Sequence, residues 1–299
     1  MQPATIANVD TLLDSEPSAA LIRDIADVAL SMCSPGSECP DYFAGLEQAL
    51  HDEPPPFGTA EYGLIYRSLA VEPRWMAVSL ITNAEREGDG ATRLWSLAAC
   101  SPDPGHAELL KRHACDESRH ALLYLALLDL AFPGSVSPQF RAELRQLSPG
   151  FAMHQQVYPV PGSPYAKAPT LDDFIQMNIA EIRTAIHHIM QRPALAQHCP
   201  EESAPAIRRI QDSLLRDELR HIAYTAVLIE EYAHQPEGAR LAELFGIRLR
   251  NFNDITTREL GNNVYDCSVA CCARNPSCRS KAPGAASAPA LYQIGLNSH

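Results

Sequence analysis

Long stretches of the chain carry apolar residues at helical spacing and contain no proline. These stretches span 105–132, 170–192, 206–235 and 237–275, and they are rich in Ala, Leu, Glu and Arg, which favour helix. Proline removes a backbone donor and clashes inside a helix, so the proline clusters between the stretches indicate helix ends. No segment of comparable length alternates apolar and polar residues with period two, so we expect no strands.

The pattern therefore predicts an all-α protein. Residues 1–73 would form N-terminal helices that pack on a bundle, 74–262 the four-helix bundle and one further helix, and 263–299 a flexible tail. We expect helices over 18–32, 42–51, 59–70, 74–99, 106–131, 171–192, 206–234 and 238–260.

Composition and charge narrow the classes of partner. The 299 residues include 24 Lys+Arg against 36 Asp+Glu, and the net charge of −12 disfavours nucleic acid or an anionic membrane as a partner. Hydrophobic residues make up 46% of the chain, which is enough for a globular core. We find no apolar run that would span a bilayer and no secretion signal at the start. Nine cysteines at irregular spacing indicate reduced thiols, so we expect a cytoplasmic protein.

Two of the predicted helices carry the same five-residue motif. The first copy spans 116–120 (Asp-Glu-Ser-Arg-His) and the second spans 217–221 (Asp-Glu-Leu-Arg-His). Residues i and i+3 share a helix face, so each Glu and its His can reach one point. Helical spacing places both Glu117 and Glu218 on apolar stripes, where an unpartnered charge is costly. One such pair is ordinary, whereas two core-facing copies favour a metal, because a dication offsets several buried carboxylates.

A di-metal site in a four-helix bundle needs one more carboxylate from each of two other helices. On helix 74–99, Glu87 lies on the apolar stripe, whereas Glu85 lies beside the polar face. On helix 171–192, Glu181 is the interior Glu. Both chosen residues lie as deep in the fold as the motif carboxylates, counted from the connecting turns. The candidate metal ligands are therefore Glu87, Glu117, His120, Glu181, Glu218 and His221.

The order Glu, Glu-x-x-His, Glu, Glu-x-x-His resembles that of the ferritin-like non-haem di-iron carboxylate proteins. The resemblance covers roughly residues 74–235 and is most specific in the two motif copies. It implies a ferritin-like four-helix bundle with additional N- and C-terminal helices. It also implies two iron ions, with manganese as an alternative, and dioxygen as co-substrate.

The resemblance further implies hydrogen bonds from the motif Asp residues to the imidazoles of the opposite helix. Asp116 would hold His221, and Asp217 would hold His120. A solvated helix face is the simpler alternative for these Asp residues. Arg119 points away from the apolar stripe, as does Arg220 in the second copy, and we expect both at the surface or in salt bridges between helices.

One position separates the subclasses of this superfamily. Arylamine N-oxygenases carry an extra His one turn before the last motif Glu, where this chain has Leu214. We therefore expect six protein ligands and chemistry closer to C–H oxidation, desaturation or C–C cleavage. Arylamine N-oxygenation is the second choice. His188 is an alternative source of the extra imidazole, although a packed His explains it more simply.

Two further residues are candidates for a catalytic role. Tyr124, four residues after His120, resembles the radical tyrosine of ribonucleotide reductase small subunits. Thr184, one turn after Glu181, resembles the threonine near the metals of di-iron hydroxylases. A core Tyr with a bonded hydroxyl and a Thr that bonds its own backbone are the commoner explanations.

We expect an oxidoreductase, namely a di-iron monooxygenase acting on a small organic molecule in secondary metabolism. No Gly-rich nucleotide-binding segment follows a strand, so electrons would come from a separate ferredoxin or reductase. An iron-storage or peroxide-detoxifying protein is the alternative. An enzyme would be a monomer or homodimer, whereas a storage protein would be a large cage. The tail cysteines match a zinc motif only loosely, and we expect an incidental cluster: Cys267, Cys271, Cys272 and Cys278.

Overall fold

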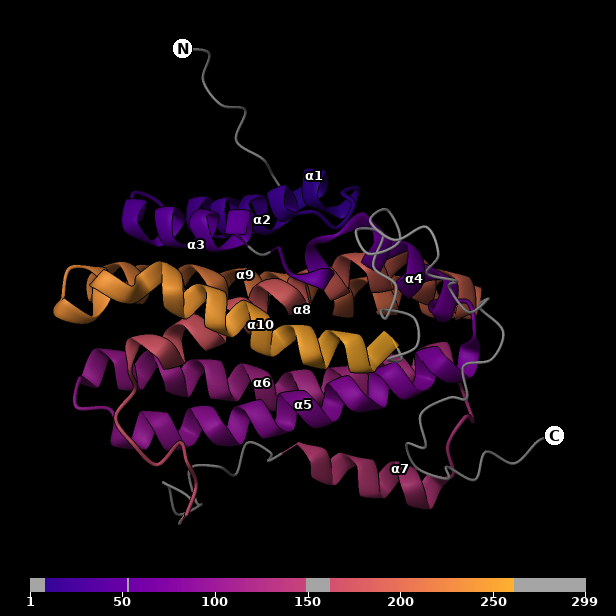
Figure 1. Ribbon diagram of the computed structural model, residues 1–299. Helices are drawn as coiled ribbons and strands as arrows, with labels where there is room; N and C mark the ends of the chain where they lie inside the picture. Colours follow the sequence, from indigo (N-terminus) through magenta and orange to yellow (C-terminus); the bar gives the residue numbers. More distant parts are fainter. Residues whose placement is uncertain (1–8, 53, 149–161, 261–299) are drawn as a thin grey trace.

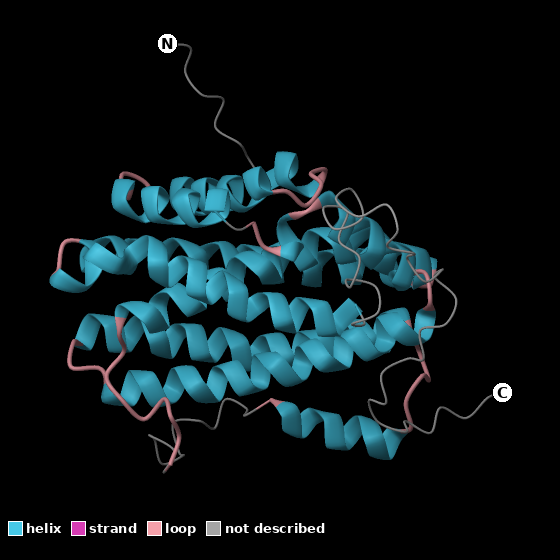
Figure 2. Ribbon diagram, in the orientation of Figure 1, coloured by secondary structure: helices cyan, strands magenta, loops and turns pink. Residues whose placement is uncertain are grey.

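A computed structural model of the chain describes residues 9–52, 54–148 and 162–260, and these ranges contain helices and no strand (Figures 1 and 2). The α-helices are α1 (Val9–Leu13), α2 (Ala19–Cys33), α3 (Pro40–Asp52), α4 (Ala60–Ala70), α5 (Pro73–Cys100), α6 (Pro104–Ala131), α7 (Pro138–Leu144), α8 (Leu171–His198), α9 (Ala204–Ala233) and α10 (Leu241–Leu260). Short 3₁₀ turns lie between them at Pro56–Gly58, Arg145–Leu147, Glu201–Ser203 and Pro236–Arg240.

The all-α prediction is confirmed, and each predicted helix is present with ends that differ by a few residues. The largest difference is in α8, which we expected to end before Pro193 but which continues to His198. Ala194 and Leu195 are both buried, so the apolar stripe continues past the proline and favours helix despite the lost backbone donor. Two short helices, α1 and α7, were not predicted.

Four long helices form the centre of the molecule. Helix α5 packs along α6, α8 packs along α9, and α6 also contacts α9 (Figure 1). Helices α2 and α3 lie against α9, and α10 covers α8 and α3. Leu, Ile and Ala side chains fill the space between these helices and form one continuous apolar core. Any polar group in the middle of the four helices is therefore removed from water.

Side-chain caps fix where two of the long helices begin, and so which residues face the core. Asp103 accepts a hydrogen bond from the His106 N–H at the start of α6. Thr170 and Asp173 form a reciprocal capping box at the start of α8. Because the side chains of a helix follow from its register, these caps also set the orientation of Glu117 and Glu181.

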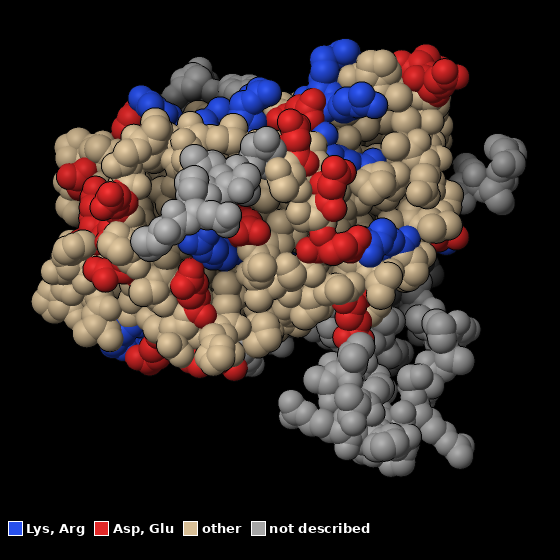
Figure 3. All heavy atoms as spheres, turned by 90° about the horizontal axis from the view of Figure 1, so that it is seen from above, with Lys and Arg blue, Asp and Glu red and all other residues tan. Residues whose placement is uncertain are grey.

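Charged side chains of both signs are scattered over the face that α1–α3 cover (Figure 3). Among the described helices, none is both long enough and apolar enough to cross a membrane. The cysteines within the described ranges are free thiols at Cys33, Cys39, Cys100, Cys115 and Cys199. The four tail cysteines lie outside the described residues, and the division into 1–73, 74–262 and 263–299 stays a prediction.

Candidate metal centre

All six predicted ligand residues are buried, and they meet between α5, α6, α8 and α9. Helix α5 contributes Glu87, whereas its neighbour Glu85 is exposed, in agreement with the chosen register. Helix α8 contributes Glu181, even though the end of this helix was placed too early. The motif copies contribute a Glu and a His each from α6 and α9.

One side of the cluster is built around His120. Its Nδ1 atom lies 3.5 Å from Glu87 Oε2 and 3.4 Å from Glu117 Oε1. The same nitrogen lies 3.5 Å from Glu218 Oε1. Three carboxylates from three helices therefore face one imidazole nitrogen.

The other side is built around His221. Its Nδ1 atom lies 3.6 Å from Glu117 Oε1 and 3.7 Å from Glu181 Oε2. It also lies 3.5 Å from Glu218 Oε2. Glu117 and Glu218 thus face both imidazoles, whereas Glu181 faces only this one. Two shared carboxylates and one separate carboxylate on each side are compatible with the donor set of a di-metal carboxylate site.

The far nitrogen of each imidazole is held by an Asp of the opposite motif. Asp217 Oδ2 lies 3.2 Å from His120 Nε2, and Asp116 Oδ2 lies 3.3 Å from His221 Nε2. These are the two pairs that the resemblance implies. An Asp acceptor keeps a proton on Nε2 of its imidazole, so that Nδ1, which faces the carboxylates, is the nitrogen that would bind a metal once it gives up its own proton.

Two arginines connect the Asp residues at the rim of the cluster. Arg119 contacts the carboxylates of Asp116 and Asp217, and Arg220 contacts the same two carboxylates. The four side chains form a ring of salt bridges between α6 and α9, as expected for inter-helix arginines. The positive charges help to lower the pKa of Asp116 to about 2, although burial alone would raise it and the bond to His221 is the larger lowering cause. Burial would raise the pKa of Asp217 as well, but the bond to His120 and the arginine charges lower it, so both Asp residues stay ionised as acceptors.

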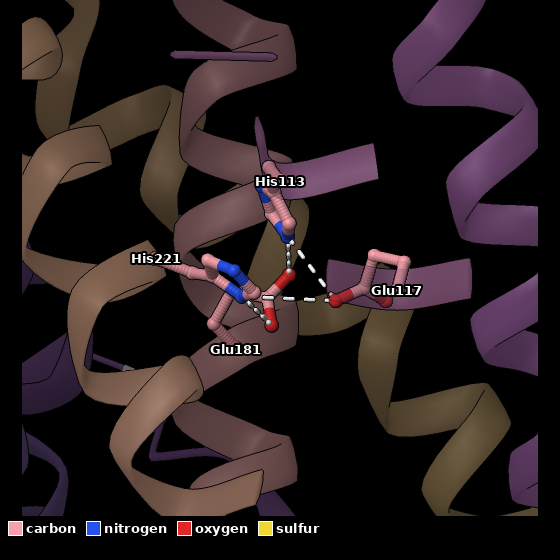
Figure 4. Close-up of side chains that lie close together, drawn as sticks. All are labelled: His113, Glu117, Glu181 and His221. Atoms are coloured by element: carbon pink, nitrogen blue, oxygen red, sulfur yellow. Dashed lines mark ion pairs between the residues drawn. The ribbon is translucent and has the colours of Figure 1, made fainter. Parts of the chain in front are cut away.

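His113 joins the cluster and was not predicted as a ligand. Its Nε2 atom lies 3.4 Å from Glu117 Oε1 and 3.2 Å from Glu181 Oε1. One group that can hold a metal ion consists of His113, Glu117, Glu181 and His221, all buried (Figure 4). A second such group consists of Glu87, Glu117 and His120, and the predicted ligand Glu218 belongs to neither group. The signal was present in the sequence, because His113 lies one turn before Glu117 and flanks the same apolar stripe.

The cluster fits a metal better than it fits a closed hydrogen-bond network. Within the described residues, these inward-facing atoms have no hydrogen-bond partner: Glu117 Oε1, Glu218 Oε2, His113 Nε2, His120 Nδ1 and His221 Nδ1. They come from α6 and α9, and each is a ligand atom that iron or manganese accepts. All of them except the Glu218 oxygen belong to residues of the two groups that can hold a metal ion. Buried polar atoms without partners are costly, and divalent cations held by these groups would satisfy those atoms.

The pKa directions show how the metal-free cluster shares protons. Burial and neighbouring carboxylates raise the pKa of Glu87 and Glu218 well above the ordinary value. Burial acts on Glu117 as well, but contacts with His113 and His120 outweigh it and hold the Glu117 pKa well below its ordinary value. Burial lowers the pKa of His113, yet Tyr224 and then the neighbouring carboxylates raise it well above the ordinary value. Burial lowers the pKa of His120 as well, and the carboxylates around it, with Asp217 first, raise it well above the ordinary value. Metal binding at these atoms would therefore release protons.

The residues suggested for catalysis lie next to the cluster rather than in it. Tyr124 is buried, and its hydroxyl lies 3.5 Å from His188 Nε2, which in turn lies 3.4 Å from Glu218 Oε1. His188 is thus a buried neighbour of a candidate ligand and belongs to neither metal-holding group. Thr184 is half-buried on α8, one turn after Glu181. Catalytic roles for Tyr124 and Thr184 stay predictions.

Leu214 is fully buried one turn before Glu218, as expected. The imidazole that α9 lacks at this turn has a counterpart at the same turn of α6, because His113 belongs to a group that can hold a metal ion. His113 is therefore a seventh candidate ligand. The set of six protein ligands and the choice between C–H oxidation and amine N-oxygenation stay predictions.

Comparison with family models, with curated proteins and with solved structures finds no match to the chain. The side chains of the cluster are therefore the features that bear on function.

Proposed function

We propose that this protein is a ferritin-like di-iron oxygenase that uses dioxygen to oxidise a small organic molecule. The proposal is carried by one arrangement: four buried carboxylates face the Nδ1 atoms of two imidazoles. The Nε2 atom of each imidazole contacts an Asp of the opposite helix. Four carboxylates balance the charge of two divalent cations. Carboxylate-rich sites with few imidazoles suit iron or manganese better than copper or zinc.

The four long helices support the ferritin-like arrangement. In that arrangement two helices each contribute one Glu and the other two each contribute Glu-x-x-His. Here α5 and α8 contribute the single carboxylates, Glu87 and Glu181, and α6 and α9 contribute the motifs. The two motif helices contact each other directly, which matches the cross-pairing of Asp and His between them.

The protein's own residues would hold and insulate the metals. Glu117 and Glu218 would be shared between two ions, because each faces both imidazoles. Asp116 and Asp217 would orient the imidazoles and increase their basicity. The apolar core around the cluster would exclude water. Bound iron would pass electrons from an external reductant to dioxygen and offer it open coordination positions.

The donor set also bears on the class of substrate. Arylamine N-oxygenases carry an extra His, and His113 adds an imidazole to this cluster. Aromatic amines should therefore be tested together with aldehydes and with substrates that are oxidised at a C–H bond. Electrons would come from a separate ferredoxin or reductase. Iron storage is the alternative function, and it predicts a large cage and many iron ions per chain.

Oxygen uptake tests the proposal. The protein is loaded with ferrous iron without oxygen, supplied with a chemical reductant, and screened against aromatic amines, aldehydes and carrier-bound fatty acids. We expect substrate-dependent uptake of oxygen and an oxidised product visible by mass spectrometry, with ¹⁸O from labelled dioxygen if an oxygen atom is inserted. Uptake that depends only on iron, together with a cage-sized assembly, would favour storage instead. Glu117→Gln is the control that should abolish uptake.

A further inference from the structure

The two motif helices differ at one turn that faces the cluster. One turn before the motif Glu, α6 carries His113 and α9 carries Leu214, and both side chains are buried. The imidazole of His113 reaches carboxylates from α6 and α8, at 3.4 Å from Glu117 and 3.2 Å from Glu181. A buried Leu has no atom that can serve this purpose. Of the two groups that can hold a metal ion, only the one with His221 therefore includes a second imidazole, because His188, 3.4 Å from Glu218, belongs to neither group.

His113 is held in the way that a metal-binding His is held. Its Nδ1 atom lies 2.7 Å from the Tyr224 hydroxyl, so one ring nitrogen is engaged and Nε2 faces the carboxylates. The ring stacks on His221 with a centroid separation of 3.7 Å and an angle of 27°. Tyr224 lies one turn after His221 on α9, so the helix that lacks the extra imidazole supplies its anchor. The Tyr224–His113 pair thus parallels the two Asp–His pairs.

We propose that the two metal positions are unequal, and that His113 makes the position beside His221 the first to bind a divalent transition-metal ion. This inference rests on the proposed function, since it assumes that the cluster holds two ions. The position beside His221 has two imidazoles with Glu181, whereas the position beside His120 has one imidazole with Glu87. Imidazole binds later divalent metals such as Fe²⁺ and Co²⁺ better than it binds Mn²⁺, whereas carboxylates suit Mn²⁺.

A purely structural His113 gives different expectations. Its imidazole would then serve as a packed core side chain whose charge offsets Glu117 and Glu181 in the metal-free protein. Replacing it would lower the stability of the metal-free protein and weaken both metal positions together through the shared Glu117. A ligand role instead confines the effect to one position.

The experiment is an oxygen-free calorimetric titration of the full-length protein with Co²⁺, followed in parallel by visible absorption. We expect two binding steps whose dissociation constants differ by about tenfold or more. Glu181→Gln should remove the tighter step and Glu87→Gln the weaker one, which assigns the steps to the two positions. His113→Leu should weaken the tighter step about a hundredfold and leave the weaker step within a few-fold of its original value.

Tyr224→Phe is the second variant, because it keeps His113 and removes only the hydroxyl that orients it. It should weaken the tighter step about tenfold, and circular dichroism should show that both variants keep their helices. Two equal steps in the unmodified protein, or two steps unchanged in folded His113→Leu and Tyr224→Phe, would overturn the inference and leave the di-metal site intact. A folded protein that binds no Co²⁺ would remove the proposed function as well.

Discussion

Helices α6 and α9 carry the same motif and make the same contacts at the outside of the cluster, yet they differ toward its interior. In each helix the motif Asp holds the imidazole of the other helix, so the outer contacts are reciprocal. Toward the interior, His113 of α6 is matched by Leu214 of α9. The repeated part accounts for how two metals would be held. The part that is not repeated accounts for how the two positions would differ.

The single-carboxylate helices show the same contrast. Glu87 on α5 and Glu181 on α8 are both buried. One turn after each of them stands Gly90 on α5 and Thr184 on α8. A Cβ atom at Gly90 would lie 3.4 Å from Glu117 Oε2, so α5 approaches the shared carboxylate closely. The two halves of the centre therefore differ in the residue at this turn as well as in donor atoms.

The largest effect should come from the carboxylates that both halves share. Glu117→Gln and Glu218→Gln should each remove both ions, because each carboxylate faces both imidazoles. Glu87→Gln should remove about one ion of two. The measurement is metal content per folded chain after oxygen-free loading with ferrous iron.

Glu85→Gln is the matched control for these variants, since Glu85 lies two residues from Glu87 on the exposed side of α5. It should keep the full metal content. Loss of metal in Glu85→Gln together with normal content in Glu87→Gln would mean that the register of α5 is wrong.

Exchanging the residues at the turn that differs should reverse the asymmetry. The double variant His113→Leu and Leu214→His moves the extra imidazole from α6 to α9. By the repeat of the two helices, the new imidazole would face the side of His120 and Glu87. We expect the order of Co²⁺ binding to reverse, with the tighter step now abolished by Glu87→Gln. An unchanged order would show that the asymmetry has another origin.

The reciprocal Asp contacts predict a crossed pattern of smaller losses. Asp217→Asn should weaken the position beside His120, and Asp116→Asn the position beside His221, each by about tenfold to a hundredfold. The variants are therefore matched controls for each other in the same Co²⁺ titration. Equal weakening of both positions by either variant would indicate a general loss of structure rather than loss of one imidazole's partner.

A smaller effect concerns pH and distinguishes His188 from the candidate ligands. Burial, followed by the charges of His120 and Arg192, lowers the pKa of His188 from 6.5 to about 3. The folded protein thus keeps this imidazole neutral where the unfolded chain protonates it. The resulting stability is present above pH 6.5 and is lost as the pH falls toward 3.

His188→Gln should remove this dependence. As the pH falls between these values, the free energy of unfolding of the metal-free variant should decrease by ~1.4 kcal/mol less per pH unit than that of the unmodified protein. Urea unfolding at neutral and mildly acid pH measures the difference. Identical slopes for the two proteins would show that His188 titrates normally in the fold.

The sequence predicted the helices and the carboxylates because both depend on periodicity. Glu87 was chosen over Glu85 as a candidate ligand because it lies on an apolar stripe. In the structure Glu87 is buried and Glu85 is exposed. The predicted end of α8 was wrong, because the rule that proline ends a helix does not take account of the buried residues beyond Pro193.

His113 was missed for a different reason. It flanks the stripe of α6 in sequence, but its role depends on Glu181 and Tyr224, which belong to α8 and α9. Spacing along one helix cannot show which side chain of another helix will lie opposite. The two Asp–His pairs were found only because the resemblance implied them.

Iron content of the unmodified protein tests the central claim most directly. The protein is loaded with ferrous iron without oxygen, freed of unbound iron, and analysed for metal per chain while circular dichroism confirms that it is folded. The account predicts about two iron ions per chain, falling to none in Glu117→Gln. A folded, helical protein that retains no iron under these conditions would contradict it.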